Sequence, residues 1–218
     1  MIIINFREIN IGNISKGLLY RSNHPIYIGN AVENTIFQAK NAKIKTIINL
    51  SDNIHVLQSK IRNCSWYENL LINNNVVAVN IDRQFDIMEK AFMQKIKQCI
   101  IFMISHEPPY LIHCEAGIDR TGFFSILLEA FMDANFEEIV KDYMLSFVEN
   151  KEYSINDRNK GSVFLRNLSS EIKGSLINPD ENLKSLVVKY LNQKIGLNKH
   201  ELDLLEKKLT NRDKLQYL

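Results

Sequence analysis

The sequence contains one cysteine whose neighbours could give it a chemical role. Cys114 is followed by five residues, then Arg120, and residues 110–122 read Tyr-Leu-Ile-His-Cys-Glu-Ala-Gly-Ile-Asp-Arg-Thr-Gly. We expect a strand to end at Cys114 and a helix to begin just after the loop. Such a loop points several backbone N–H groups at one spot, and the helix dipole adds positive potential there. The segment therefore predicts a binding site for a phosphate dianion.

Three residues of this loop have types that phosphate chemistry can use. The positive potential favours the thiolate of Cys114, which is the nucleophilic form of cysteine. Gly117 lets the backbone turn where a side chain would obstruct it. The planar fork of Arg120 can hold two phosphate oxygens, whereas a lysine would offer only a point charge. We therefore predict a nucleophile and a phosphate clamp rather than an ordinary corner with a buried cysteine.

The elements that position the loop are predicted by patterns along the first half of the chain. Short β-branched runs alternate with helical spacing of apolar residues, which is typical of a sheet covered by helices. We expect strands at 17–21, 45–50, 76–81 and 110–113, and helices around 31–42, 54–64 and 87–105.

Beyond Thr121 only helical patterns remain. They cover residues 122–134, 136–150, 157–172, 183–195 and 199–209, with a loop expected at 175–183 that is a lid or a joint. The predicted fold is α/β, with a central, mostly parallel sheet flanked by helices. We expect a core at residues 1–150, with the phosphate-binding loop at 113–122, and a helical C-terminal extension at 151–218 packed on it.

The composition is that of a soluble globular protein. The 218 residues are 45% hydrophobic and 24% charged, and the net charge is +2. The lysines are spread along the chain, so neither nucleic-acid binding nor a polybasic membrane anchor is indicated. The first apolar run is too short for a signal peptide, and we expect no membrane insertion. A cytoplasmic location is the simplest expectation, export without a cleaved signal peptide stays open, and the oligomeric state is not predicted.

The other cysteines and the histidines do not indicate a disulfide framework or a metal site. Cys64, Cys99 and Cys114 form an odd set without paired spacing. We expect Cys64 and Cys99 to be reduced, buried and inert. The five histidines are scattered, and none has a carboxylate or cysteine at ligand spacing. We therefore expect no metal and no cofactor.

The loop sequence resembles the His-Cys-x5-Arg-Ser/Thr-Gly signature of the protein tyrosine phosphatase superfamily. Its Ala-Gly pair, the acidic residue before Arg120 and its Thr-Gly end are similar to bacterial and fungal tyrosine phosphatases and to tyrosine-phosphatase-like inositol phosphate phosphatases. Weaker similarity begins at Asn5, Gly17, Lys45, Val187 and Ile195, so that the resemblance spans most of the chain. Ile118 departs from the pattern, because many bacterial members have a lysine there that could contact a phosphoinositide.

The resemblance implies a fold like that of the dual-specificity phosphatases and a two-step reaction. Cys114 would attack phosphorus while the loop, residues Glu115, Ala116, Gly117, Ile118, Asp119 and Arg120, holds the phosphate oxygens, and water would then hydrolyse the cysteinyl-phosphate. Thr121 would hydrogen-bond Cys114 as it leaves. His113 would order the loop through its ring nitrogens. Glu115 is expected to point to solvent or to pair with a basic residue.

The leaving oxygen needs a proton, and the resemblance implies an aspartate on a loop about thirty residues before the cysteine. Asp82 precedes Cys114 by 114 − 82 = 32 positions and is our first choice. Asp86 is an alternative, unless it caps the following helix. Asp119 beside Arg120 is the third candidate.

The sequence leaves the substrate open between phosphotyrosine, with or without phosphoserine and phosphothreonine, and an inositol phosphate or phosphoinositide. A catalytically silent phosphate-binding module is a further alternative, disfavoured because the reactive residues are all present. Arg7 and Arg21 could line the site, pair with loop carboxylates or be surface charges. Trp66 and Tyr67 could form a wall for an aromatic substrate, although ordinary packing is the simpler expectation.

Overall fold

The computed structural model describes residues 5–27, 29–147 and 182–210 of the chain. Five strands form one sheet, namely β1 (Arg7–Glu8), β2 (Leu19–Ser22), β3 (Thr46–Asn49), β4 (Val76–Ala78) and β5 (Tyr110–His113). Their order is β1-β2-β5-β3-β4. The pairs β2·β5, β5·β3 and β3·β4 are parallel, and β1 pairs with β2 antiparallel, so the mostly parallel sheet predicted from the sequence is confirmed.

The register of the sheet places three strand ends at the position where the loop begins. His113, the last residue of β5, is paired with Ser22 on one side and with Asn49 on the other. Because the carboxyl ends of parallel strands lie at one edge of a sheet, the segments that follow β2, β5 and β3 meet there. This edge holds the candidate site.

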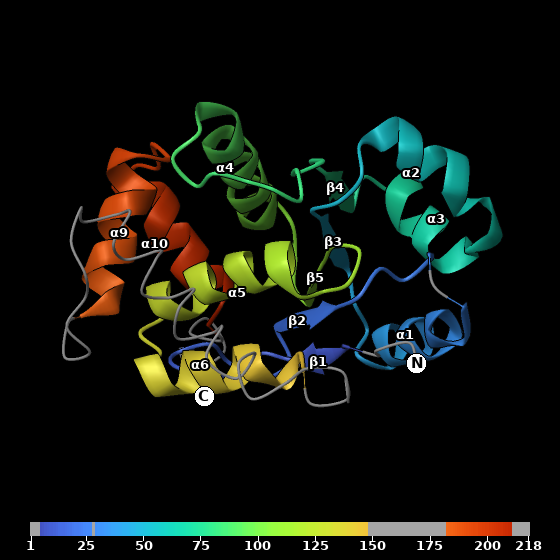
Figure 1. Ribbon diagram of the computed structural model, residues 1–218, viewed down its shortest axis with the longest axis horizontal. Coiled ribbons are helices and arrows are strands. Elements are labelled where there is room, and N and C mark those ends of the chain that lie inside the picture. The colour runs from blue at the N-terminus through green and yellow to red at the C-terminus, as the bar shows by residue number, and fades with distance from the viewer. Residues whose placement is uncertain (1–4, 28, 148–181, 211–218) are drawn as a thin grey trace, which may run out of the picture.

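Helices cover both faces of the sheet (Figure 1). They are α1 (Gly29–Asn41), α2 (Ile54–Lys60), the 3-10 helix η1 (Ile61–Asn63), α3 (Ser65–Ile72), α4 (Lys90–Ser105), α5 (Asp119–Phe131), α6 (Phe136–Leu145), α9 (Leu183–Gln193) and α10 (Lys199–Lys208). None of these described helices is long and apolar enough to cross a bilayer.

Alternation along the strands divides the core into two clusters. Ile48 and Ile112 point into the larger cluster, which contains the buried residues of α4, α5, α9 and α10. Their neighbours Ile47 and Leu111 point to the opposite face, where buried residues of α1, α2 and α3 cover them. Successive strand residues face opposite sides of a sheet, so a continuous apolar run in β3 and β5 is what a doubly covered sheet requires.

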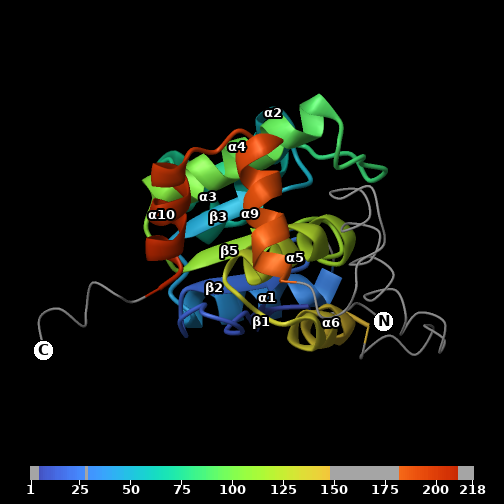
Figure 2. The same cartoon turned by 90° about the vertical axis from the view of Figure 1, so that its left-hand side faces the viewer.

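The C-terminal helices are part of the larger cluster. α9 contacts α5 and α10 contacts α4, and Figure 2 shows α9 lying against α5. The buried Tyr190 hydroxyl of α9 donates a hydrogen bond of 2.6 Å to the carbonyl oxygen of Ile87, in the segment before α4. The domain boundary expected near residue 150, the helix at 157–172 and most of the loop at 175–183 lie outside the described residues.

Two elements were not predicted from the sequence. β1 has only two residues, which is too short to show a pattern of alternation. α3 occupies a segment for which we predicted no element, because Ser65, Glu68 and Asn69 interrupt its apolar residues. Among the described residues, the other strands and helices agree with the prediction except at their ends, which pattern reasoning places least well.

Candidate active site

The residues that follow β5 form a tight loop closed by the start of α5. Figure 1 shows this loop joining β5 to α5. Cys114 is the first residue after β5, only 3% exposed, and its Sγ accepts a hydrogen bond of 3.3 Å from the backbone N–H of Gly117. The predicted strand, loop and helix therefore occur in the expected order, with the cysteine at the bottom of the loop.

Hydrogen bonds from outside the loop hold its carbonyl groups. The Glu115 carbonyl accepts from the backbone N–H of His24 at 2.9 Å. The Gly117 carbonyl accepts from Asn5 Nδ2 at 2.8 Å and from Arg21 Nη2 at 3.1 Å. In a planar trans peptide the C=O and the next N–H point in opposite directions. The N–H groups of Ala116 and Ile118 therefore point away from these donors, which is the orientation an anion site needs.

Gly117 is the residue of this loop that cannot carry a side chain. Its φ is +74°, in the left-handed region, and a Cβ placed on it would lie 2.4 Å from the carbonyl oxygen of Ser22. This contact is with backbone and cannot be relieved by a rotamer change. The role expected for Gly117 from the sequence thus has a steric cause in the end of β2.

Arg120 lies on the first turn of α5 and is only 8% exposed. Its Nη1 donates to the carbonyl oxygen of Ile81 at 3.0 Å, and its Nη2 lies 3.8 Å from Glu115 Oε2. Glu115 also pairs with the exposed Arg83, so it takes the second of the two arrangements expected for it. The guanidinium thereby connects the loop after β5 to the segment that carries Asp82.

The three candidate acids lie in different surroundings. Asp82 directly follows Ile81, is exposed, and accepts a hydrogen bond of 2.9 Å from the backbone N–H of Gln84. Asp119 is the exposed first residue of α5, where a negative charge is favourable. Asp86 accepts from the Met88 N–H at 2.8 Å. The next helix starts at Lys90 with Glu89 as its N-cap, so Asp86 does not take the capping position that the sequence left open as an alternative.

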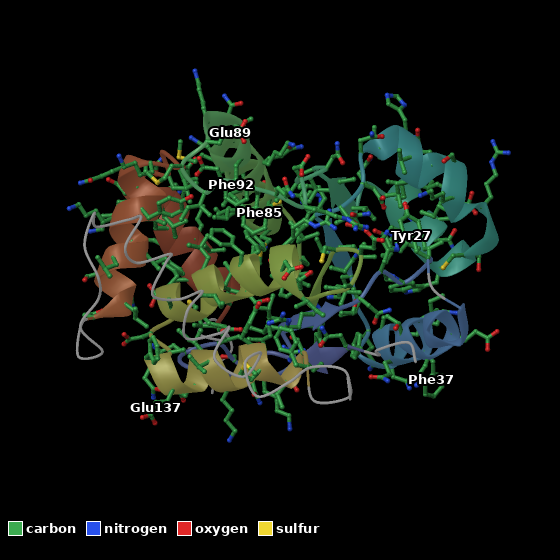
Figure 3. All side chains as sticks on the ribbon, in the orientation of Figure 1. Tyr27, Phe37, Phe85, Glu89, Phe92 and Glu137 are labelled. Atoms are coloured by element: carbon green, nitrogen blue, oxygen red, sulfur yellow. The ribbon has the colours of Figure 1, made fainter. Side chains whose placement is uncertain are left out.

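A cavity of about 290 Å³ adjoins the segment after β4. Phe85 and Phe92 line it, and their rings stack with centroids 5.1 Å apart (Figure 3). Asp82 lies on its wall. The candidate acid therefore borders a space with an aromatic side.

His113 supports the loop from below. Its Nδ1 donates to the Cys114 carbonyl at 3.3 Å, and its Nε2 accepts from the hydroxyl of Tyr67 at 2.8 Å. Tyr67 in turn accepts a hydrogen bond of 3.3 Å from Asn49. Burial, together with the nearby His24, holds the pKa of His113 well below its usual value, so the ring is neutral. Tyr67 is fully buried, so it packs and supports rather than forming a wall for a substrate.

A second buried group, Asp52, ties together the segments after β2 and β3. Its carboxylate accepts from His24 Nε2 at 2.7 Å, from the Tyr27 hydroxyl at 2.5 Å and from Asn49 Nδ2 at 2.9 Å. Burial raises the pKa of Asp52, but these hydrogen bonds outweigh it and hold the pKa well below its usual range. Sequence analysis missed Asp52, although its place three residues after Asn49, the last residue of a buried strand, was a signal.

Arg7 and Arg21 have a role that the sequence did not predict. Both bind Asp142 of α6, through Arg7 Nε at 2.8 Å and Arg21 Nη1 at 2.8 Å. Arg21 is fully buried and also reaches the Gly117 carbonyl. These arginines therefore pair with a carboxylate outside the loop, and neither lies free on the surface.

Thr121 is buried on α5, and its hydroxyl has no hydrogen-bond partner among the described residues, Cys114 included. Its interaction with the leaving thiolate stays a prediction. Ile118 is buried in the larger core cluster. Cys64 and Cys99 are free and buried, as predicted, and burial raises the pKa of both thiols.

The chain is similar to a known sequence family and to solved structures. A sequence model described as "Tyrosine phosphatase family" matches residues 3–211. The chain is similar to the core catalytic domain of the PP-IP phosphatase SIW14 from S. cerevisiae, with 15% identity over 79% of this chain and 96% of that one and a TM-score of 0.45. It is also similar to P. aeruginosa TpbA, with 14% identity over 85% of this chain and 91% of that one and a TM-score of 0.48. No curated protein sequence matches the chain.

Proposed function

The chain belongs to the tyrosine phosphatase family, and from this premise we propose that it hydrolyses phosphotyrosine monoesters through a cysteinyl-phosphate intermediate. The observation that carries the proposal is the loop itself. Cys114 Sγ lies against the Gly117 N–H, and the carbonyls of Glu115 and Gly117 are held from behind. This arrangement supports binding of a phosphate dianion above a thiolate.

In the first step the Cys114 thiolate attacks phosphorus. The S–P bond forms as the P–O ester bond breaks, and the leaving oxygen takes a proton from Asp82. Arg120 and the loop N–H groups stabilise the charge that builds on the other phosphate oxygens. To do so, Arg120 exchanges its hydrogen bond with the Ile81 carbonyl for the substrate, so binding is coupled to the segment that carries Asp82.

In the second step a water molecule attacks the cysteinyl-phosphate. A P–O bond forms, the S–P bond breaks, and the sulfur leaves as a thiolate. The carboxylate that gave its proton in the first step takes one from the water. A hydrogen bond from Thr121 to the departing sulfur would lower the cost of that charge.

The charges beside the loop favour an ester with one phosphate over a polyphosphorylated inositol. Asp119 is an exposed residue of the loop, and the exposed Asp82 follows Ile81, whose carbonyl contacts Arg120. Glu115 is already paired with Arg83. A phosphotyrosine side chain carries all its negative charge on the group that the loop binds. Additional phosphates would meet these carboxylates, and Ile118 offers them no positive charge.

The proposal is tested with the purified chain on phosphotyrosine, phosphoserine and phosphothreonine peptides, phosphoinositides and inositol hexakisphosphate. We expect the highest kcat/KM for phosphotyrosine peptides, and no turnover for Cys114→Ser, which keeps the loop but lacks the thiolate. A higher kcat/KM for the inositol compounds than for the phosphotyrosine peptides would show that the substrate is an inositol phosphate or a phosphoinositide. Binding of phosphate without turnover of any substrate by the wild type would indicate a non-catalytic module.

A further inference from the structure

One face of α5 carries buried polar atoms without protein partners. Among the described residues, the buried side-chain nitrogens and oxygens that lack a hydrogen-bond partner are Arg21 Nε, Thr121 Oγ1, Ser125 Oγ and both carboxyl oxygens of Glu129. Thr121, Ser125 and Glu129 are four residues apart, which places them on the same side of the helix. This polar seam starts at the phosphate-binding loop and ends at Glu129, which is 0% exposed.

The groups that face Glu129 come from β1, β2 and α6. They are the guanidinium groups of Arg7 and Arg21 and the carboxylate of Asp142. Both arginines are directed at Asp142, with N···O distances of 2.8 Å. No described arginine or lysine forms an ion pair with Glu129, so its carboxyl group lies beside a carboxylate that already holds the available cations.

We propose that Glu129 keeps its proton inside the folded protein at neutral pH, and that the cluster behind the phosphate-binding loop therefore has a net positive charge. An ionised carboxylate without a hydrogen-bond donor is among the most costly groups to bury, whereas a neutral carboxylic acid costs far less. Two adjacent carboxyl groups also avoid ionising together, and Asp142 is the one that the arginines stabilise. In agreement with this geometry, burial and the charge of Asp142 raise the pKa of Glu129, against a smaller effect of Arg21 and Arg7.

The charge of the cluster follows from this assignment. Arg7 and Arg21 contribute +2, Asp142 contributes −1 and neutral Glu129 contributes nothing, which leaves 2 − 1 = +1. Arg21 carries this charge to the loop, because its Nη2 donates to the Gly117 carbonyl. For phosphate binding this consequence rests on the proposed function. The positive potential under the loop would then come from a buried cation as well as from the helix dipole.

The proton on Glu129 is tested by infrared difference spectroscopy of the whole chain near pH 7, which needs no catalytic activity. We expect the C=O stretching band of a buried protonated carboxylic acid in the wild type and its loss in Glu129→Gln. The matched control is Glu137→Gln, which changes an exposed glutamate of α6 (Figure 3) and should leave the band in place. Absence of the band from the wild type, or its survival in Glu129→Gln, would overturn the proposal.

A stability measurement gives a second test. The folded-state pKa of Glu129 is raised above the ordinary 4.5, so the wild type loses stability relative to its unfolded state as pH rises above 4.5. Glutamine has no proton to lose. The free energy of unfolding of Glu129→Gln should therefore increase relative to the wild type from pH 4.5 to pH 7, as measured by urea denaturation. An opposite trend would show that Glu129 is an ionised partner of the arginines.

The variant Asp142→Asn tests whether the charge of Asp142 keeps the proton on Glu129. Without the Asp142 charge, Glu129 faces two arginines with no competitor, and it should release its proton and lose its infrared band at pH 7. A band that persists in this variant would contradict the role of Asp142. If this variant does not fold, the comparison of Glu129→Gln with Glu137→Gln still decides whether Glu129 is protonated. A missing phosphatase activity, in contrast, would refute the proposed function and leave these readouts unaffected.

Discussion

Arg120 occupies its position because of contacts that a lysine could not reproduce. Its guanidinium reaches the Ile81 carbonyl and lies near Glu115 while it stays almost fully buried. In the proposed reaction it must also present two donors to the phosphate. A single ammonium group offers neither the reach nor the planar fork.

We therefore predict that Arg120→Lys strongly reduces catalytic activity. The charge is kept, but a bidentate contact to the transition state is lost, which lowers kcat/KM for a phosphotyrosine peptide by about 100-fold or more. Steady-state kinetics measure the effect, and Arg83→Lys, on an exposed side chain, is the control. Unchanged kcat/KM in Arg120→Lys would contradict the proposal that Arg120 holds two phosphate oxygens.

The identity of the acid is tested by the dependence on the leaving group. Asp82→Asn should lower kcat by about 10² to 10⁴ for alkyl phosphates and poor aryl leaving groups. The effect should be much smaller for an activated aryl phosphate, whose oxygen leaves without a proton. The basic limb of the pH profile should also flatten, because it reports loss of the acid's proton.

Asp119→Asn is the comparison for this experiment. Asp119 is also exposed and belongs to the loop, but it lies at the start of α5 and not on the segment joined to Arg120 through Ile81. If the leaving-group dependence becomes steeper only in Asp119→Asn, the acid role passes to Asp119.

At the residue scale, the sequence was sufficient to predict those site residues that lie close together in the chain. Cys114, Gly117 and Arg120 fall within seven consecutive positions, so their spacing alone predicted a loop for a phosphate. The residues that hold this loop come from far away in the chain. Asn5 and Arg21 are separated from Gly117 by 112 and 96 positions. No pattern in one sequence indicates such contacts, and the sequence left Arg21 open between a role at the site and a surface charge.

At the scale of the elements, one buried carboxylate holds the segments after β2 and β3 together by hydrogen bonds. Asp52 joins His24, Tyr27 and Asn49, and His24 in turn donates its backbone N–H to the Glu115 carbonyl in the loop after β5. The strand ends were predicted within a few residues from their apolar runs. The connection between them was not, because hydrogen bonds between loops depend on the register of the sheet.

We predict that Asp52→Asn lowers the free energy of unfolding at pH 7 by about 1.5–3 kcal/mol, since hydrogen bonds to a charged group are lost. The pKa of Asp52 is lower in the folded state than its ordinary 3.8, so its contribution is present above pH 3.8 and is lost as pH falls below that value. Urea denaturation at pH 7 and at pH 3 measures the difference, which should shrink at the lower pH. Asp203→Asn, an exposed site on α10, is the control. A deficit that is equal at both pH values would contradict this account of Asp52.

For the whole molecule, the question is whether the C-terminal helices form one cooperative unit with the sheet. Leu191 of α9 and Leu205 of α10 are fully buried, in the same cluster as Ile112 of β5 and Phe123 of α5. The helical pattern of these segments was visible in the sequence. Their partners were not, because a helical stripe shows which face is buried and not what covers it. We propose that residues 182–210 unfold together with the core.

Leu191→Ala tests this proposal. Removing a fully buried leucine side chain should lower the free energy of unfolding by about 2–5 kcal/mol. If α9 belongs to the same cooperative unit, helix content and phosphatase activity should be lost together in one transition, at a lower urea concentration than in the wild type. Phe37→Ala, at a position of α1 that is 64% exposed (Figure 3), should leave the transition nearly unchanged. A first transition that removes helical signal while activity persists would instead show that α9 and α10 unfold independently of the sheet that carries Cys114.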